Sequence, residues 1–216
     1  MTQLFRPRAN VLSKLSIAAA VAFIGVLGAV AFMLDRSAYT TRQGVIIEQP
    51  VPFSHAHHVE AIGLDCRYCH STVEHSSFAG IPSTETCMNC HTQIWPEAPM
   101  LEPIRASFRN GQPIEWVRVH NLPDFVRFDH SIHVAKGISC ETCHGRVDQM
   151  PITWQENSLQ MKWCLDCHRD PVPNIRPREE VFTMGWEPPE GFAELQRELA
   201  EKYEVKSLMS CSTCHY

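Results

Sequence analysis

The ten cysteines of the chain form five pairs with the same spacing, and a histidine directly follows each pair. The motifs are Cys66-Cys69-His70, Cys87-Cys90-His91, Cys140-Cys143-His144, Cys164-Cys167-His168 and Cys211-Cys214-His215. Two thiols separated by two residues can add to the two vinyl groups of haem, and the next histidine then becomes the proximal ligand of the iron. The spacing therefore predicts five covalently bound c-type haems.

Two other chemistries use closely spaced cysteines, namely structural zinc and disulfide bonds. Neither requires a histidine directly after the second cysteine. All five pairs have that histidine, and no cysteine is left over. Haem attachment is therefore the preferred interpretation.

An internal duplication supplies candidates for the second axial ligands. Residues 53–70 and 128–144 share the pattern Phe-x-His-x-x-His-Val, followed by a Cys-x-x-Cys-His motif, and a second motif follows each copy. This indicates two repeat modules at about 53–91 and 128–168, with a fifth haem appended at 211–215. Histidines three positions apart project from one side of a helical turn, so each pair can ligate two different irons. We expect one histidine of each pair to reach the haem that follows in its own repeat and the other to reach a different haem.

The predicted distal ligands are His55, His58, His120, His130 and His133. His120 is the best histidine candidate for the position that the repeated pairs leave open. Methionine is the alternative there, and it would give that iron a higher reduction potential. The methionine candidates are Met150, Met161, Met184 and Met209, each of which can instead simply fill the core. His57 and His75 are expected to be solvated or to bind haem propionates.

The chain is short for five haems. With 216 residues, it cannot wrap each macrocycle in an aliphatic core, so the haems themselves are expected to form the core. This predicts a mainly α protein with short helices around the motifs, extensive loop and little β structure. Residues 171–190 are proline-rich and predict an extended connector. From Glu190 to about Lys206, Phe192, Leu195, Leu199 and Tyr203 recur at helical spacing, which predicts a helix packed over the fourth or fifth haem.

The N-terminal part contains an uncharged apolar run from Leu15 to Leu34. It is long enough to cross a bilayer as a helix, and Arg6, Arg8 and Lys14 precede it, which predicts a cytoplasmic start and an external remainder. A cleaved signal peptide is the alternative, because Ala29-Val30-Ala31 resembles a cleavage site, but the run is longer than is usual for such signals.

The predicted organisation is a cytoplasmic start and single span at 1–36, a linker at 37–52, and a multihaem domain at 53–216. The net charge of −5 argues against nucleic-acid binding.

The repeated Phe-x-His-x-x-His segments are similar to those of cytochromes c3 and c7, in which such a pair supplies distal ligands to two haems. This resemblance covers about residues 53–168. The fuller pattern includes AGIPSTETCMNCH, RVHNLPDFVRFDHSIHVAKGISCETCHGRVDQMP, LQMKWCLDCHR, the anchor and the fifth motif. It resembles the pentahaem subunit of bacterial alternative complex III, a quinol:electron-acceptor oxidoreductase.

That resemblance implies an electron relay that holds no quinol pocket of its own. It implies an inner-membrane anchor, a periplasmic haem domain, and delivery of electrons to a soluble cytochrome c or blue copper protein. The implied partners are integral membrane quinol-binding subunits, an iron–sulfur subunit and a monohaem cytochrome c subunit. The resemblance assigns no role to His75.

Two other functions compete with a relay. A multihaem enzyme needs an iron with an open distal position, which the number of candidate ligands and the absence of an altered motif such as CxxCK disfavour. A stand-alone, membrane-anchored multihaem quinol dehydrogenase that feeds periplasmic reductases is the more serious alternative. In such a protein we expect the first haem close behind the span, whereas residues 35–65 intervene here and carry FSHAHH.

Overall fold

The computed structural model describes residue 6 and residues 8–216. The chain divides into two compact units, one that ends at Arg42 and one from Gln43 to Tyr216. The boundary falls within the predicted linker, residues 37–52. Residues 1–5 and 7, which belong to the predicted cytoplasmic start, lie outside the described part.

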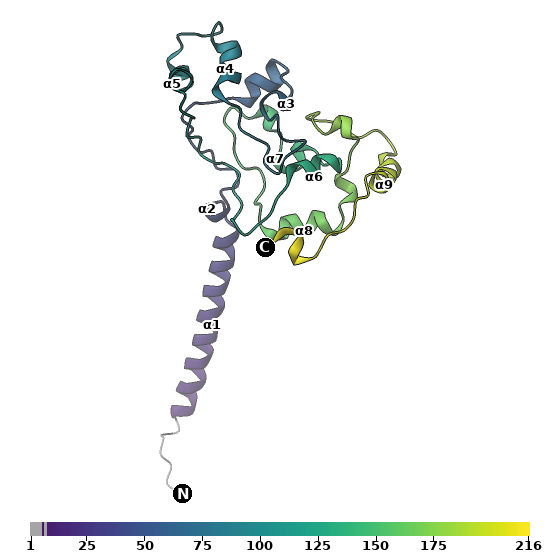
Figure 1. Cartoon of the computed structure of the whole chain (residues 1–216). Helices are drawn as coiled ribbons and strands as arrows, with labels where there is room; N and C mark the ends of the chain where they lie inside the picture. Colours follow the sequence, from purple (N-terminus) through teal and green to yellow (C-terminus); the bar gives the residue numbers. More distant parts are fainter. Residues whose placement is uncertain (1–5, 7) are drawn as a thin grey trace. The chain divides into compact units, whose positions relative to one another are not determined.

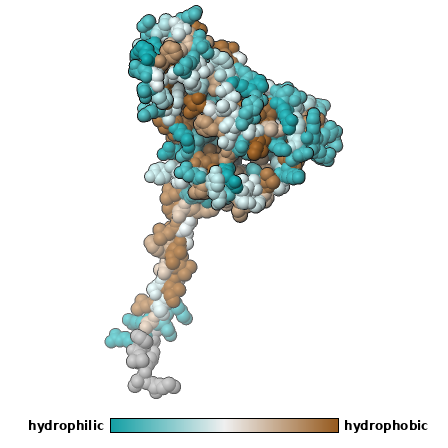
Figure 2. Space-filling model, viewed as in Figure 1, coloured by the Kyte–Doolittle hydropathy of each residue, from teal (hydrophilic) through white to brown (hydrophobic). Residues whose placement is uncertain are grey.

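The first unit is dominated by one long helix, α1 (Arg8–Arg36), followed by the short α2 (Ala38–Thr41). α1 has 29 residues, and none of them is buried. It is long and apolar enough to span a membrane, and Figures 1 and 2 show its length and its apolar surface. The hydroxyls of Ser37 and Thr40 both donate to the carbonyl of Leu34, which satisfies an acceptor that the end of the helix leaves free. α1 could thus anchor the chain in a membrane.

The second unit consists of short helices joined by long loops. Its α-helices are α3 (Cys66–Cys69), α4 (Thr84–His91), α5 (Glu102–Asn110), α6 (His130–Ala135), α7 (Cys140–His144), α8 (Met161–Arg169), α9 (Phe192–Lys202) and α10 (Cys211–Cys214). Its other helical turns are η1 (Ala56–Ala61), η2 (Pro99–Leu101), η3 (Val147–Gln149), η4 (Val172–Asn174) and η5 (Arg178–Glu180). The residues described contain isolated β-bridges but no strand. The predicted class, mainly α with extensive loop and little β, is confirmed.

Each Cys-x-x-Cys motif lies on its own helix: α3, α4, α7, α8 or α10. Residues three apart on a helix share one side, so this local fold points both thiols of a motif the same way. The chain is extended just before each helix, and in the first motif the Asp65 carboxylate accepts from the Arg67 N–H at 2.8 Å. The motif geometry is therefore fixed locally.

The apolar core made by side chains alone is small. Two clusters of buried residues are present in the described part: Ile138, Ile175, Phe192, Leu199, Ala200 and Tyr203 in one, and Val51, Leu101 and Ile104 in the other. So limited a core agrees with the expectation that macrocycles supply much of the interior. The predicted helix near the C-terminus is present as α9, and its stripe packs on Ile138 and Ile175.

The segment before the third motif is held against the predicted connector. Ile138 pairs with Ile175 in an antiparallel bridge, and the Arg176 N–H donates to the Gly137 carbonyl at 2.9 Å. Gly137 has φ +78°, and a Cβ there would lie 2.5 Å from the Arg176 carbonyl oxygen. Only glycine allows this approach. The connector thus fixes where the third motif starts.

Candidate functional site

All ten motif cysteines are free thiols, and every one has some exposure. Cys87 packs against the cluster of Val51, Leu101 and Ile104, but it is only partly buried, so each thiol keeps surface for attachment to a vinyl group. The cysteines therefore fit haem attachment and not a disulfide framework.

Three of the motif histidines are oriented by a backbone carbonyl. The Nδ1 atom lies 2.6 Å from the Gly80 oxygen for His70, 3.0 Å from the Ile94 oxygen for His91, and 3.4 Å from the Phe125 oxygen for His215. A carbonyl only accepts, so Nδ1 carries the proton in each case. Nε2 is left as the nitrogen that can bind iron.

The second histidine of each repeated pair is oriented in the same way. His58 donates from Nδ1 to the Ser54 carbonyl at 2.8 Å, and His133 donates to the Asp129 carbonyl at 2.6 Å. Each carbonyl lies four residues earlier on the same turn. The two repeats thus build the same local structure.

The first histidine of each pair is anchored by the other repeat. The Nδ1 atom of His130 donates to the Ser77 carbonyl at 2.8 Å, and His55 Nδ1 lies 2.9 Å from the Thr153 hydroxyl. Ser77 follows the first motif and Thr153 follows the third. Each repeat therefore fixes a ligand candidate of its partner repeat.

The phenylalanine of the repeated pattern packs against both histidines. Phe53 stacks on His58 with 4.5 Å between ring centroids and meets His55 edge-on at 4.9 Å. Phe128 repeats this with His133 at 4.6 Å and His130 at 4.8 Å. Our sequence analysis gave the phenylalanines no role, although their recurrence in both copies was the signal.

Three pairs of histidine rings have the separation that one shared iron requires. Imidazole binds first-row metals at about 2 Å, so two imidazoles on one iron have centroids about 6 Å apart. The observed distances are 6.2 Å for His58 and His91, 6.1 Å for His133 and His168, and 6.3 Å for His130 and His144. The residues present thus fit axial pairs on the second, fourth and third haems.

His55 is close enough to the proximal histidine His70 for the two rings to influence each other electrostatically. Burial lowers the pKa of His55 to about 4, and the charge of His70 is the largest of the neighbouring contributions. Burial likewise lowers the pKa of His144 to about 3. Both imidazoles are neutral near pH 7, which is the form that binds a metal.

His120 lies beside the motif histidine of the third haem site, and its assignment to the fifth iron stays a prediction. Its Nε2 atom is 3.2 Å from Nδ1 of His144, with 4.3 Å between the ring centroids. This position is behind the third motif, on the side of His144 away from the nitrogen that would bind iron. In the described part of the chain, the ring that packs near His215 is Phe125, at 5.7 Å, and no histidine ring takes that place.

The methionine candidates differ in exposure. Met150 is 1% exposed and fills the core, whereas Met161 and Met209 are 64% and 41% exposed. Met184 is half-buried. A methionine that ligates a haem iron must have side-chain surface that is not covered by other protein atoms. This requirement favours Met161, Met184 and Met209 over Met150.

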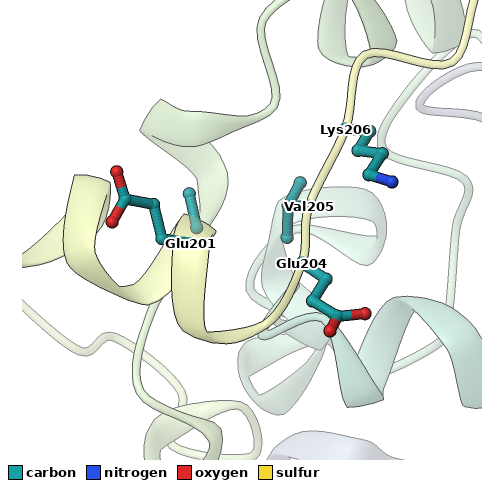
Figure 3. Close-up of a pocket in the computed structure, with 5 residues that line it drawn as sticks. Glu201, Glu204, Val205 and Lys206 are labelled. Carbon is teal, nitrogen blue, oxygen red and sulfur yellow. The ribbon is translucent and has the colours of Figure 1, made fainter.

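The two histidines that the sequence analysis set aside differ in their surroundings. The ring of His57 meets that of His58 edge-on at 5.4 Å and stacks on Trp95 at 5.5 Å, whereas His75 is exposed. A surface pocket beside the end of α9 is separate from the motifs, because Ala200, Glu201, Glu204, Val205 and Lys206 line it and none of these is a cysteine or histidine (Figure 3).

Comparison with known proteins identifies the class of site. Residues 126–216 match the family of cytochrome c7 and related cytochromes c. The chain contains a cytochrome c7-like multihaem domain. The matched region holds the second repeat and the fifth motif, and the first repeat is related to it by the internal duplication.

Two curated proteins are similar to this chain over part of their length. The multihaem cytochrome c subunit of menaquinone reductase from Nitratidesulfovibrio vulgaris is 39% identical over 98 residues, which are 45% of this chain and 46% of that protein. The acrylate reductase cytochrome subunit from Shewanella woodyi is 23% identical over 112 residues, 52% of this chain and 69% of that protein. The chain thus spans about half of the first relative. Haem c is the cofactor that this family indicates.

Proposed function

We propose that this chain is the pentahaem electron-relay subunit of a membrane quinol:acceptor oxidoreductase of the alternative complex III type. The observation that carries the proposal is the pairing of histidine rings at 6.1 to 6.3 Å on three different motifs. An iron with histidine on both sides has no position for a substrate, so these sites pass electrons and do not bind reactants. A non-catalytic role within a larger complex follows.

The chain's own residues hold and tune the cofactors. Haem c supplies one-electron chemistry when bound. Each pair of motif thiols would hold a haem covalently through two thioether bonds, and each motif histidine would ligate its iron. His58, His130 and His133 would supply the second histidine at the second, third and fourth haems, and we assign His55 to the first. The carbonyl acceptors keep each ring oriented and its Nε2 available.

The fifth iron takes its distal ligand from outside the histidine pairs. His120 lies at the third motif, so we assign the fifth position to one of the exposed or half-buried methionines, Met161, Met184 or Met209. An iron with histidine and methionine has a higher potential than its bis-histidine neighbours. The fifth haem is then the natural electron sink of the chain.

The names of the relatives support the quinol side of the proposal. One is a subunit of a menaquinone reductase and the other a subunit of an acrylate reductase, so related cytochromes serve multi-subunit reductases. For this chain we propose integral membrane quinol-binding subunits, an iron–sulfur subunit and a monohaem cytochrome c subunit as partners. The soluble acceptor is a cytochrome c or a blue copper protein.

The location follows from α1. Arg8 and Lys14 lie on the N-terminal part of this helix, which favours a cytoplasmic N-terminus and a single span in the bacterial inner membrane. The haem domain is then periplasmic, where covalent haem attachment takes place.

The main alternative is a stand-alone quinol dehydrogenase, and two measurements separate it from a relay. Purification of the tagged full chain in mild detergent should bring down integral membrane and iron–sulfur proteins. The chain purified away from them, in liposomes that contain a reduced quinol, should stay oxidised. Rapid reduction by quinol without any partner contradicts the relay, and intact mass with fewer than five haems contradicts the cofactor assignment.

A further inference from the structure

The first and second motifs touch through the residues between their cysteines. Tyr68 lies between Cys66 and Cys69, and its hydroxyl accepts from Asn89 Nδ2 at 3.2 Å. Asn89 lies between Cys87 and Cys90. The turn that carries His55 and His58 serves both motifs, since His58 faces His91. The first repeat thus places its two motifs side by side.

The third and fourth motifs are joined in the same way. Helix α6 presents His130 to His144 at 6.3 Å and, one turn on, presents His133 to His168 at 6.1 Å. Asn157, shortly before α8, donates to the Cys143 carbonyl at 2.8 Å.

The two repeats meet through their first motifs. The anchoring is reciprocal, because the loop after the first motif holds His130 and the loop after the third motif holds His55. The first and third motifs are therefore neighbours, and the second and fourth lie on the outer sides.

The fifth motif is attached beside the fourth. The Ser207 hydroxyl, in the segment that leads to α10, donates to the His168 carbonyl at 2.9 Å. The Arg127 N–H donates to the Cys214 carbonyl at 2.7 Å, which ties the fifth motif to the segment just before α6. Figure 1 shows the succession α4, α3, α7 and α8 within the second unit, with the C-terminus next to α8.

These contacts carry a conclusion about the electron path, which rests on the proposed function. We infer that the five haem sites form one unbranched linear chain in the order second, first, third, fourth, fifth. The haems bound at Cys87 and at Cys211 are then the two ends, where electrons enter and leave. Electrons would pass from one repeat to the other between the first and third haem sites.

The order can be tested by raising the potential of one haem and observing which others respond. A haem that is already reduced carries one positive charge fewer, so it lowers the potential of its neighbours, and the effect falls with distance. His58→Met alters the second haem, at one end of the linear chain, and should lower the potential of the first haem more than that of any other haem. His130→Met alters the third haem, in the middle, and should lower both the first and the fourth.

The measurement is stepwise reduction of the full chain in detergent, with the haem methyl signals of each site followed by NMR. Intact mass with five haems in both variants keeps the proposed function separate from the order. A larger shift of the third, fourth or fifth haem than of the first in His58→Met overturns the inference, as does a response of only one neighbour in His130→Met.

Wild-type protein gives a second measurement that does not depend on the variants. In the fully reduced, diamagnetic state, proton contacts between haems should link the second to the first, the first to the third, the third to the fourth and the fourth to the fifth. Contacts that link the second haem to the fifth, or that place the third at an end, also overturn the inference.

Discussion

The Nδ1 atom of His144 lies 3.2 Å from Nε2 of His120, and the two rings meet edge-on at 76°. The other oriented motif histidines donate to backbone carbonyls, so His144 differs in having a side chain as its acceptor. Burial lowers the pKa of His120, which favours a neutral ring, and a neutral imidazole can accept at one of its two nitrogens. We therefore propose that His120 positions the proximal ligand of the third haem, as an alternative to its predicted role as distal ligand of the fifth.

Replacement of His120 should change the potential of one haem without loss of any. An acceptor on Nδ1 makes the opposite ring nitrogen a stronger donor to the metal, which stabilises the oxidised iron. We expect His120→Ala to raise the potential of the third haem and His120→Gln, whose amide oxygen can accept, to restore part of the difference. Potentiometric titration checks this.

His75→Ala is the matched control for His120→Ala, because His75 is an exposed histidine outside the predicted set of axial ligands. It should leave all five potentials unchanged. A new high-spin signal in His120→Ala would show that His120 binds an iron directly and would return it to the ligand set.

The sequence predicted the helical motifs and the paired histidines because both depend on local spacing. The thiols three positions apart and the pairs His55/His58 and His130/His133 keep their relation on any helical turn. The partner of His120 could not be predicted in this way, because tertiary contacts bring residues 120 and 144 together. The carbonyl acceptors were also hidden, since any residue type supplies a carbonyl.

Loss of His130 should expose the third iron without loss of the haem. The thioether bonds to Cys140 and Cys143 do not depend on the axial ligand, so His130→Ala should keep five haems while one becomes high-spin. Optical and EPR spectra measure this. If all haems stay low-spin, the pairing of His130 with His144 is wrong.

Phe128 should control the orientation of two ligands at once. Its ring packs on both His130 and His133, so Phe128→Ala leaves both imidazoles without their packing partner. We expect broadened low-spin EPR signals for the third and fourth haems and unchanged signals for the second. Phe78→Ala, at a residue that is 58% exposed, is the control and should have no effect. Equal broadening in both variants would argue against an orienting role.

The ion pair of Glu141 and Arg176 should matter more for stability than the surface pairs. Their side chains are 16% and 11% exposed and 2.5 Å apart, and Glu141 also accepts from the Gly185 N–H at 2.7 Å. Glu141→Gln leaves the Arg176 charge poorly compensated, which should cost about 1–3 kcal/mol. Asp166→Asn, in an exposed pair, should cost about 0–1 kcal/mol. Urea unfolding checks the difference, and equal midpoints would contradict it.

Retention of α1 decides whether the haem domain carries its own membrane anchor. A cleaved leader would end near Ala29-Val30-Ala31, inside a helix that continues to Arg36 and is followed by the Ser37 and Thr40 contacts to Leu34. Because the apolar stretch is as long as a bilayer is thick, we expect the mature protein to keep it. Peptide mapping of the membrane fraction should find residues 15–34, and alkaline carbonate should not release the haem domain. A mature N-terminus after residue 31, with the haem domain in the soluble fraction, would establish cleavage and contradict the retained anchor.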